Sequence, residues 1–257
     1  MENVGSSTRQ ARTAQTAVTP GASAAEAPVS LHVVADKPQI PAYLQDTYYW
    51  AYINPRNVRL LDREIVVRTI LWQQHNRLQQ LAFAEISEGQ SVLQPAAVYG
   101  SFSANLAQHV GPRGSLDVID VAEIQVVNTR RKLKDFPQAT VHHANALQLG
   151  SKPYDVVCCY FLLHEIPEKE KFAAVNLFLS KLKPGGKAVF VDYHKPRWWH
   201  PLKPITSLVF DTLEPYAKGL WRREIQDFAD NPESYSWRKE TIFGTLFQKV
   251  VATKVEP

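Results

Sequence analysis

Short apolar runs alternate with longer amphipathic stretches along most of the chain. Five segments have the composition of strands that are buried in a parallel sheet: residues 91–93, 116–121, 139–143, 154–163 and 187–193. The stretches between them predict helices over 101–110, 123–133 and 168–182, and Ser101 or Ser103 is the expected cap of the first. Two further strands are expected over 239–253. Repeated β-α-β units predict a doubly wound, mostly parallel α/β sheet of seven strands, with ligands at the carboxyl ends of the strands.

The segment before this sheet has two parts. Residues 1–38 consist mainly of Ala, Ser, Thr, Gln and Pro, and such a stretch predicts a disordered tail because it buries too little apolar surface to offset its ordering entropy. Arg9 and Arg12 keep a mitochondrial targeting segment open as an alternative, whereas Glu2 and Glu26 count against it.

Residues 39–90 predict a helical region with an aromatic cluster at 43–52, followed by one helical segment up to Glu88 and Gly89. The aromatic cluster is interpreted either as a lid over a flat ligand or as a core helix packed on the sheet. His75 is expected on an exposed helix face, and His109, His142 and His143 are expected to be solvated.

Composition and charge narrow the class of protein. Hydrophobic residues make up 45% of the 257 residues and charged residues 21%, which is typical of a globular protein. The formal net charge of +4 is too small to indicate nucleic acid as a partner by itself, and no apolar run is long enough for a membrane-spanning helix. The two cysteines, Cys158 and Cys159, are adjacent and read as strand residues, so a reduced, cytosolic setting fits best.

The first two predicted strands have the spacing of a nucleotide site. Gly100 closes the turn after the first strand, and Asp120 ends the second strand twenty residues later. In a doubly wound sheet an acid at this position accepts hydrogen bonds from ribose hydroxyls. A surface acid after a strand is the alternative, because this pair of features is common.

A longer set of motifs carries a resemblance to a known family. The sequence contains Tyr154-Asp155-Val156-Val157, Phe161 to Pro167, Leu182-Lys183-Pro184-Gly185-Gly186-Lys187 and Phe190 to Pro196. Over residues 91–196 it resembles the class I S-adenosylmethionine (SAM) methyltransferases, which have a Rossmann-like sheet, and among them it is most similar to the quinone C-methyltransferases. The resemblance implies SAM as co-substrate, with contacts from Gln94, Gly100, Asp120, Val121, Asn145, Ala146 and Tyr160.

One position departs from that family. Its first strand usually ends in an acid followed by a glycine-rich turn, and the acid helps to hold the cationic amino group of SAM. Here the stretch is Leu93-Gln94-Pro95-Ala96-Ala97-Val98-Tyr99-Gly100, so the acid is replaced by Gln94 and only the last glycine remains. A neutral residue lowers the pKa of a neighbouring ammonium relative to a carboxylate, so Gln94 favours an amine that loses its proton and acts as a nucleophile. Neutral drift at this position is the alternative.

Together with residues 48–64 and 197–202, this change resembles the rhodoquinone biosynthesis proteins. That resemblance implies replacement of a ring methoxy group of ubiquinone by an amino group from SAM, a requirement for manganese, and a substrate-facing insert around 195–235 in the α/β domain over 91–257. It also implies a cytoplasmic protein with transient contact to the inner face of a bacterial membrane, or to the matrix side in a mitochondrion. A SAM-dependent methyltransferase acting on a quinone or phenol, and a noncatalytic SAM-fold subunit of a quinone-synthesising complex, are the alternatives.

Candidate reactive residues lie at the expected strand ends. Gln94, Tyr99, His164 and Asp192 are the catalytic candidates, and His164, Asp192 and His194 are the candidates for binding manganese, which accepts oxygen and imidazole ligands. A satisfied polar residue at a loop mouth is the alternative for each metal candidate. Trp198 and Trp199, among basic residues, suit either a membrane interface or packing on the last strands.

Overall fold

The structure is a computed structural model that describes residues 1–2 and 38–255 of the chain. The tail predicted over 1–38 lies, apart from its first two residues and its last, outside the described residues. The following account concerns residues 38–255, which belong to one compact unit.

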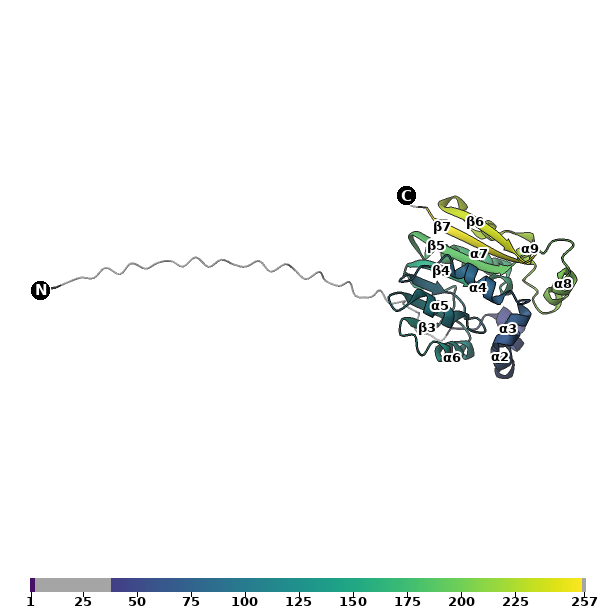
Figure 1. The fold of residues 1–257 in the computed structure, drawn as a ribbon, viewed down its shortest axis with the longest axis horizontal. Coiled ribbons are helices and arrows are strands. Elements are labelled where there is room, and N and C mark those ends of the chain that lie inside the picture. The colour runs from purple at the N-terminus through teal and green to yellow at the C-terminus, as the bar shows by residue number, and fades with distance from the viewer. Residues whose placement is uncertain (3–37, 256–257) are drawn as a thin grey trace. The chain divides into compact units, whose positions relative to one another are not determined.

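A mixed sheet of seven strands forms the centre of this unit (Figure 1). Its strands, in spatial order, are β3 (Ala139–His143), β2 (Ser115–Asp120), β1 (Ser91–Gln94), β4 (Tyr154–Tyr160), β5 (Leu182–Tyr193), β7 (Phe247–Lys254) and β6 (Tyr235–Ile242). The first five are parallel, whereas β7 is antiparallel to both β5 and β6. The predicted α/β fold, with its number of strands, is therefore confirmed.

Helices cover both faces of the sheet because successive strand residues point to opposite sides. Val92 of β1 belongs to the core under α4 (His75–Phe83), α5 (Phe102–Val110) and α6 (Glu123–Lys132). Leu93, the next residue, belongs to the core under α7 (Glu168–Ser180) on the opposite face. Glu168 and Glu170 lie in the first turn of α7, where negative charge is favourable. This arrangement leaves the carboxyl ends of the parallel strands to the loops, where the candidate residues lie.

The region before β1 is broken into short helices instead of the single segment that the apolar spacing predicted. They are α1 (Ala42–Asp46), a π-helical turn η1 (Tyr49–Ile53), α2 (Pro55–Leu61), α3 (Glu64–Ile70) and α4. Asn54 caps α2, since its side chain accepts a hydrogen bond from the amide of Arg56. Trp72 and Gln73 have φ values of +50° and +62°, so the chain turns sharply between α3 and α4.

Three element boundaries also differ from the prediction. Ser101 precedes α5, but its hydroxyl donates to Glu64 and does not cap the helix. β4 ends at Tyr160, three residues earlier than predicted, and the last of those residues, Leu163, begins a 3₁₀ turn, η2 (Leu163–Glu165). β5 begins at Leu182, which pairs with Tyr154, and the register then shifts before the pairing resumes at Val156. Residues 184–186, Pro-Gly-Gly, therefore form a bulge in the pairing of β4 with β5 in addition to following the end of α7.

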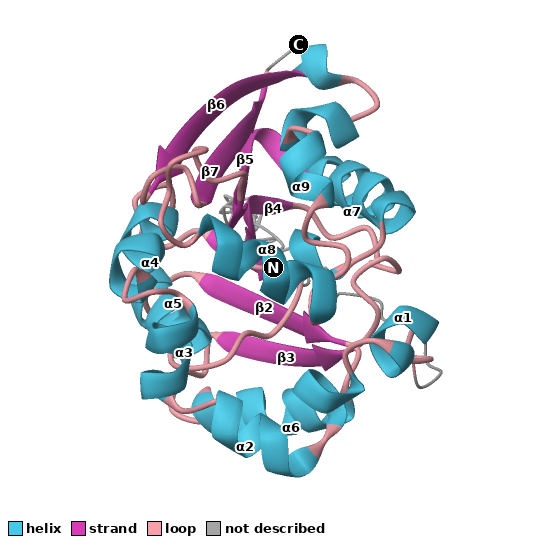
Figure 2. Cartoon of the chain, turned by 90° about the vertical axis from the view of Figure 1, so that its right-hand side faces the viewer, coloured by secondary structure: helices cyan, strands magenta, loops and turns pink. Residues whose placement is uncertain are grey.

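The connection between β5 and β6 covers the region in which a substrate-facing insert was predicted, and that role remains a prediction. It holds α8 (Lys203–Thr212), α9 (Gly219–Arg222) and the 3₁₀ turns η3 (Ile225–Phe228) and η4 (Pro232–Ser234). Figure 2 shows α8 in front of the sheet. Within the described residues, no helix combines the length and the apolar character that crossing a membrane requires.

Candidate functional site

A cleft of about 700 Å³ lies at the carboxyl ends of β1, β2 and β4. Its floor comes from the loops after these strands, and its outer wall comes from the aromatic region before β1. The residues that line it include Tyr43, Tyr52, Pro95, Ala96, Ala97, Asp120, Val121, Asn145, Ala146, Leu162 and Glu165. Four of the predicted SAM contacts, Asp120, Val121, Asn145 and Ala146, thus line one cleft.

Asp120 is held by backbone amides at the end of β2. Its two carboxylate oxygens accept hydrogen bonds from the amides of Ala97, at 3.1 Å, and Ala122, at 2.8 Å. Burial raises the pKa of Asp120 to about 7, although these amides oppose the shift. The carboxylate is thus poised to accept ribose hydroxyls, and its role in SAM binding remains a prediction.

Gln94 lies beneath the same cleft. Its side chain is fully buried, and its amide nitrogen donates to the carbonyl of Ala96 at 2.7 Å. Among the described residues, no donor reaches its side-chain oxygen. A buried carbonyl oxygen without a donor is costly. Gln94 itself lines neither this cleft nor the second cleft beside it, so its contact with the amine of SAM remains a prediction.

A second cleft of about 880 Å³ adjoins the first. Both are lined by Tyr52, Ala96, Ala97 and Glu165, so they share a wall. The second cleft is richer in aromatic side chains, and its lining includes Trp50, Tyr99, Tyr160, Phe161, His164, Tyr193 and Glu214. Tyr160, predicted as a SAM contact, therefore lies at this cleft, where its ring stacks on Phe102.

His164 is the buried imidazole of the second cleft. Its Nδ1 atom lies 2.9 Å from a carboxylate oxygen of Asp192, which is itself only 1% exposed. Burial alone lowers the pKa of His164, but the Asp192 carboxylate more than offsets this effect and the pKa rises to about 9. At neutral pH the ring is an imidazolium, so Nε2 is a hydrogen-bond donor for an oxygen in the cleft.

Two further acids surround this imidazole. Glu165 accepts a hydrogen bond from the hydroxyl of Tyr52, and its carboxylate lies 3.6 Å from Nε2 of His164. Burial raises the pKa of Glu165 to about 8, so this group holds a proton at neutral pH. Glu214, on the far side of the insert, lines the same cleft, and burial raises its pKa as well. Glu214 was not predicted from the sequence, because a lone Glu-Pro after a helix carries no signal of its own.

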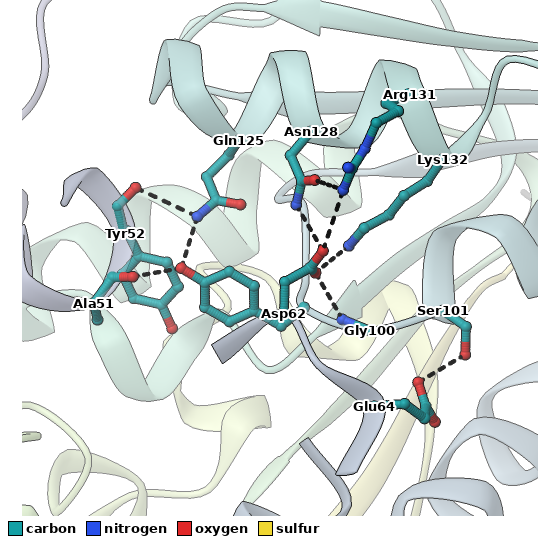
Figure 3. A network of polar contacts seen from close by, with 11 residues as sticks. Ala51, Tyr52, Asp62, Glu64, Gly100, Ser101, Gln125, Asn128, Arg131 and Lys132 are labelled. Atoms are coloured by element: carbon teal, nitrogen blue, oxygen red, sulfur yellow. Dashed lines mark hydrogen bonds and ion pairs between the residues drawn. The ribbon is translucent and has the colours of Figure 1, made fainter. Parts of the chain in front are cut away.

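A polar network attaches the region before β1 to the α/β unit (Figure 3). Tyr99 donates to the carbonyl of Ala51 and accepts from Gln125, and its ring stacks on that of Tyr52 at 5.6 Å between ring centres. The carboxylate of Asp62 accepts hydrogen bonds from the amide of Gly100, at 3.0 Å, and from the ammonium of Lys132. Gly100, a predicted SAM contact, is therefore buried against the loop between α2 and α3 and does not line the first cleft.

The three metal candidates do not converge. His194 Nδ1 lies 3.0 Å from the carbonyl of Thr245, and its Nε2 lies 2.9 Å from the ammonium of Lys239, away from the His164–Asp192 pair. Within the described residues, no group of three or more His, Cys, Asp or Glu side chains is arranged to hold a metal ion. The residues present therefore do not fit the implied manganese in this arrangement, and no step below depends on a metal.

Several other expectations are corrected or refined by burial. His75 is only 2% exposed, contrary to the prediction, because it packs at the start of α4 beside Glu64, whose carboxylate lies 2.8 Å from Nε2. His142 is half-buried, 2.8 Å from a carboxylate oxygen of Asp117, and is not freely solvated. Cys158 and Cys159 are buried residues of β4, as expected.

Comparison with known proteins agrees with this geometry. Residues 92–186 match the sequence profile of a methyltransferase domain family. The chain is 27% identical, over 165 residues, to the ubiquinone/menaquinone biosynthesis C-methyltransferases UbiE of Yersinia enterocolitica and Yersinia pseudotuberculosis. Each of these matches covers 61% of this chain and 61% of the relative, so the chain spans less than two thirds of the relatives' length.

Solved structures share the fold at low sequence identity. An O-methyltransferase family protein from Burkholderia thailandensis superposes with a TM-score of 0.59 at 14% identity, covering 80% of this chain and 62% of the other. The N-methyltransferase NodS from Bradyrhizobium japonicum, in complex with S-adenosyl-L-homocysteine, superposes with a TM-score of 0.55 at 14% identity, covering 84% of this chain and all of the other. The chain thus has the fold of the class I SAM-dependent methyltransferases, matches a methyltransferase domain family over residues 92–186, and is distantly similar to quinone C-methyltransferases.

Proposed function

We propose that the protein is a SAM-dependent transferase that acts on the ring of a quinone or phenol. The observation that carries the proposal is the shared wall between the two clefts. One cleft offers Asp120 and Asn145 to an adenosine, and the other offers aromatic walls and a buried imidazolium to a flat oxygenated ring. The similarity to quinone C-methyltransferases supports the same substrate class and favours methyl transfer as the reaction.

The side chains of the second cleft suit either ring chemistry. The Nε2–H of His164 donates to a ring oxygen, and Asp192 keeps the imidazole charged and oriented. In methyl transfer this donor stabilises negative charge on the phenolic oxygen while a ring carbon attacks the SAM methyl group and S-adenosylhomocysteine leaves. The methylated carbon then loses its proton to solvent, which restores the aromatic ring. Tyr52 and Glu165 line both clefts and so lie between the two reactants.

A second candidate function is supported by Gln94. In that reaction the amino group of SAM adds to the ring carbon that carries a methoxy group of ubiquinone, and methanol leaves. Loss of the Cα proton of SAM then converts the N–Cα bond to an imine while the quinone ring is reduced to the quinol. Water hydrolyses the imine, so the nitrogen stays on the ring and the remainder of SAM leaves as a 2-oxo acid. The amine must be neutral when it attacks, and no carboxylate side chain ends β1 to keep it charged. The same imidazolium of His164 then donates to the quinone carbonyl.

The experiment that tests both candidates supplies the protein with a short-chain quinone, or its quinol, and two labelled SAM samples in parallel. One sample carries the label in the methyl group and the other carries ¹⁵N in the amino group, and the products are read by mass. A labelled methyl group on the ring supports methyl transfer. A labelled nitrogen with loss of one methoxy group supports amino transfer, and product with neither label contradicts the proposal.

A matched pair of variants separates charge from shape at position 94. Gln94→Glu restores a carboxylate, and Gln94→Met removes the amide without adding charge. If the reaction is amino transfer, Gln94→Glu should slow it at least tenfold while Gln94→Met is affected less, because only the carboxylate stabilises the ammonium. Methyl transfer should tolerate Gln94→Glu, since the sulfonium carbon reacts whether or not the amine is charged.

A further inference from the structure

Helix α8 presents an apolar face to solvent. Its buried side is formed by Thr206 and Phe210, four residues apart. Ile205, Leu208 and Val209 follow the same helical spacing on another side and are 49%, 66% and 37% exposed. A helix of a globular protein normally buries such a stripe, so this face is unusual.

Neighbouring residues extend this face. Trp198 and Trp199, just before α8, are 84% and 54% exposed, and Leu213, just after it, is 44% exposed. We call this set, Trp198, Trp199, Ile205, Leu208, Val209 and Leu213, the α8 surface. Exposed tryptophans with aliphatic residues on a helix are typical of a protein face that enters the interfacial layer of a bilayer.

Cations flank the α8 surface. Lys195, Arg197 and Arg222 line a surface groove together with Trp198. None of the three has an acidic partner among the described residues, and the guanidinium of Arg197 lies 5.8 Å from the ring centre of Trp199. The acids of that groove are engaged elsewhere, since Glu224 pairs with Lys239 and Asp227 accepts from the amide of Glu224. The groove therefore offers positive charge beside the apolar face.

We propose that the α8 surface docks on an anionic phospholipid bilayer. The buried side of α8 lies beside the second cleft, so docking through the exposed side brings that cleft close to the bilayer; this link rests on the proposed quinone substrate. Phe210 contacts Tyr193, at 5.0 Å between ring centres, and Tyr193 and Glu214 line the second cleft. Trp50 and Ile70, which line the same cleft, are 38% and 48% exposed. Figures 1 and 2 place α8 and α3 on the same side of the unit, so a docked bilayer faces the entrance for a long-tailed ring.

The charge pattern favours lipid over a second copy of the chain. A two-fold dimer through the α8 surface brings the same patch of each copy together and sets cations close to cations. Anionic headgroups neutralise Lys195, Arg197 and Arg222 while the acyl layer accepts the apolar side chains. Trp198 and Trp199 prefer the headgroup level to either water or a dry protein interface.

The experiment measures binding of the full chain to vesicles by flotation, with phosphatidylcholine vesicles and vesicles that contain phosphatidylglycerol. We expect binding to the anionic vesicles and quenching of tryptophan fluorescence by lipids brominated near the headgroup. Leu208→Asp should lower the partition coefficient at least tenfold. The pair Lys195→Glu and Arg222→Glu should do so as well, because each basic residue near such a surface contributes roughly fivefold and reversal doubles the effect.

Control variants change residues of α4 and α6, which do not belong to the α8 surface. Val127→Asp changes an apolar residue of α6 that is 60% exposed, and Arg77→Glu reverses an exposed charge on α4. Both should bind vesicles as the wild type does, and circular dichroism verifies folding of every variant. Equal binding of Leu208→Asp and wild type, or absence of binding to anionic vesicles, overturns the proposal. Concentration-dependent dimers that Leu208→Asp abolishes, without vesicle binding, show self-association instead.

Activity separates this proposal from the proposed function. If both hold, Leu208→Asp keeps the wild-type rate on a water-soluble short-chain quinone and loses rate on a long-chain quinone embedded in vesicles. Vesicle binding through α8 by a protein that is inactive on every quinone supports docking and contradicts the proposed substrate. Full activity on embedded quinone together with absent vesicle binding contradicts docking alone.

Discussion

The carboxylate of Asp62 connects the loop between α2 and α3 to two elements of the α/β unit. It accepts hydrogen bonds from the amide of Gly100 and the side-chain amide of Asn128, both at 3.0 Å, and it pairs with the ammonium of Lys132 (Figure 3). Asp62 and Lys132 side chains are only 12% and 14% exposed. Replacement of Asp62 by Ala removes these three contacts at once, together with a 4.0 Å ion pair to the exposed Arg131.

The expected cost follows from what the replacement leaves behind. Burial already lowers the pKa of Lys132, so its ammonium depends on the Asp62 carboxylate for compensation. Breaking a largely buried ion pair costs about 3 kcal/mol when one charge stays unpaired, and an amide without an acceptor adds to that. We therefore expect Asp62→Ala to lower the free energy of unfolding by about 3 kcal/mol.

A double-mutant cycle measures this reasoning directly. Urea denaturation of the wild type, Asp62→Ala, Lys132→Met and the double variant yields the coupling energy, which should reach at least about 1 kcal/mol. The double variant should be more stable than Asp62→Ala, because the uncompensated ammonium is gone. Asp211→Ala is the matched control, since Asp211 also pairs with a lysine but is 59% exposed, and its loss should cost less than about 1 kcal/mol.

Two results refute the reasoning. If the free energies of unfolding of Asp62→Ala and the wild type differ by less than about 0.5 kcal/mol, the Asp62 contacts contribute no more than exposed ion pairs do. A coupling energy near zero shows that Asp62 and Lys132 act independently and that the loop is held by other contacts.

Three further predictions follow from single buried groups. Burial raises the pKa of Asp120 to about 7, and only the carboxylate form accepts hydrogen bonds from both ribose hydroxyls of SAM. The affinity for SAM, measured by calorimetry, should therefore fall as the pH decreases below 7. The Asp120→Asn variant should bind SAM weakly, with an affinity that does not depend on pH over the same range. Burial lowers the pKa of Lys171 to about 8, so between pH 8 and about 10 this side chain is protonated in the unfolded chain and largely neutral in the folded one. The free energy of unfolding of the wild type, measured by urea denaturation relative to Lys171→Met, should therefore rise with pH across that interval. A difference that does not change with pH contradicts the shift. Gly100 has a φ of +77°, and a Cβ added there lies 2.9 Å from a carboxylate oxygen of Glu64. Gly100→Ala should therefore cost about 1–2 kcal/mol and lower the melting temperature by several degrees. Gly89 also has a positive φ, but a Cβ added there meets no atom, so Gly89→Ala measures the backbone strain alone.

The order and type of the central elements follow from local pattern. Val156 to Cys159 form a run that only a strand buried on both faces accommodates, and the spacing from Gly100 to Asp120 places an acid at the next strand end. The family resemblance added Val121, Asn145 and Ala146 to Asp120 as expected SAM contacts, and all four line one cleft. Such features depend on neighbours in sequence, and for that reason the sequence alone determined them.

Tertiary packing decided the rest. His164 and Asp192 were expected as separate strand-end residues, yet the structure places them 2.9 Å apart, whereas His194 contacts Lys239 instead. Both outcomes depend on the order of β4, β5, β7 and β6 in the sheet. Glu214 enters the cleft only because α8 folds back over Tyr193. The sequence by itself determined which side chains end the strands. The burial that sets their charge, and contacts such as that between His164 and Asp192, which are 28 residues apart, arise only when distant segments pack together.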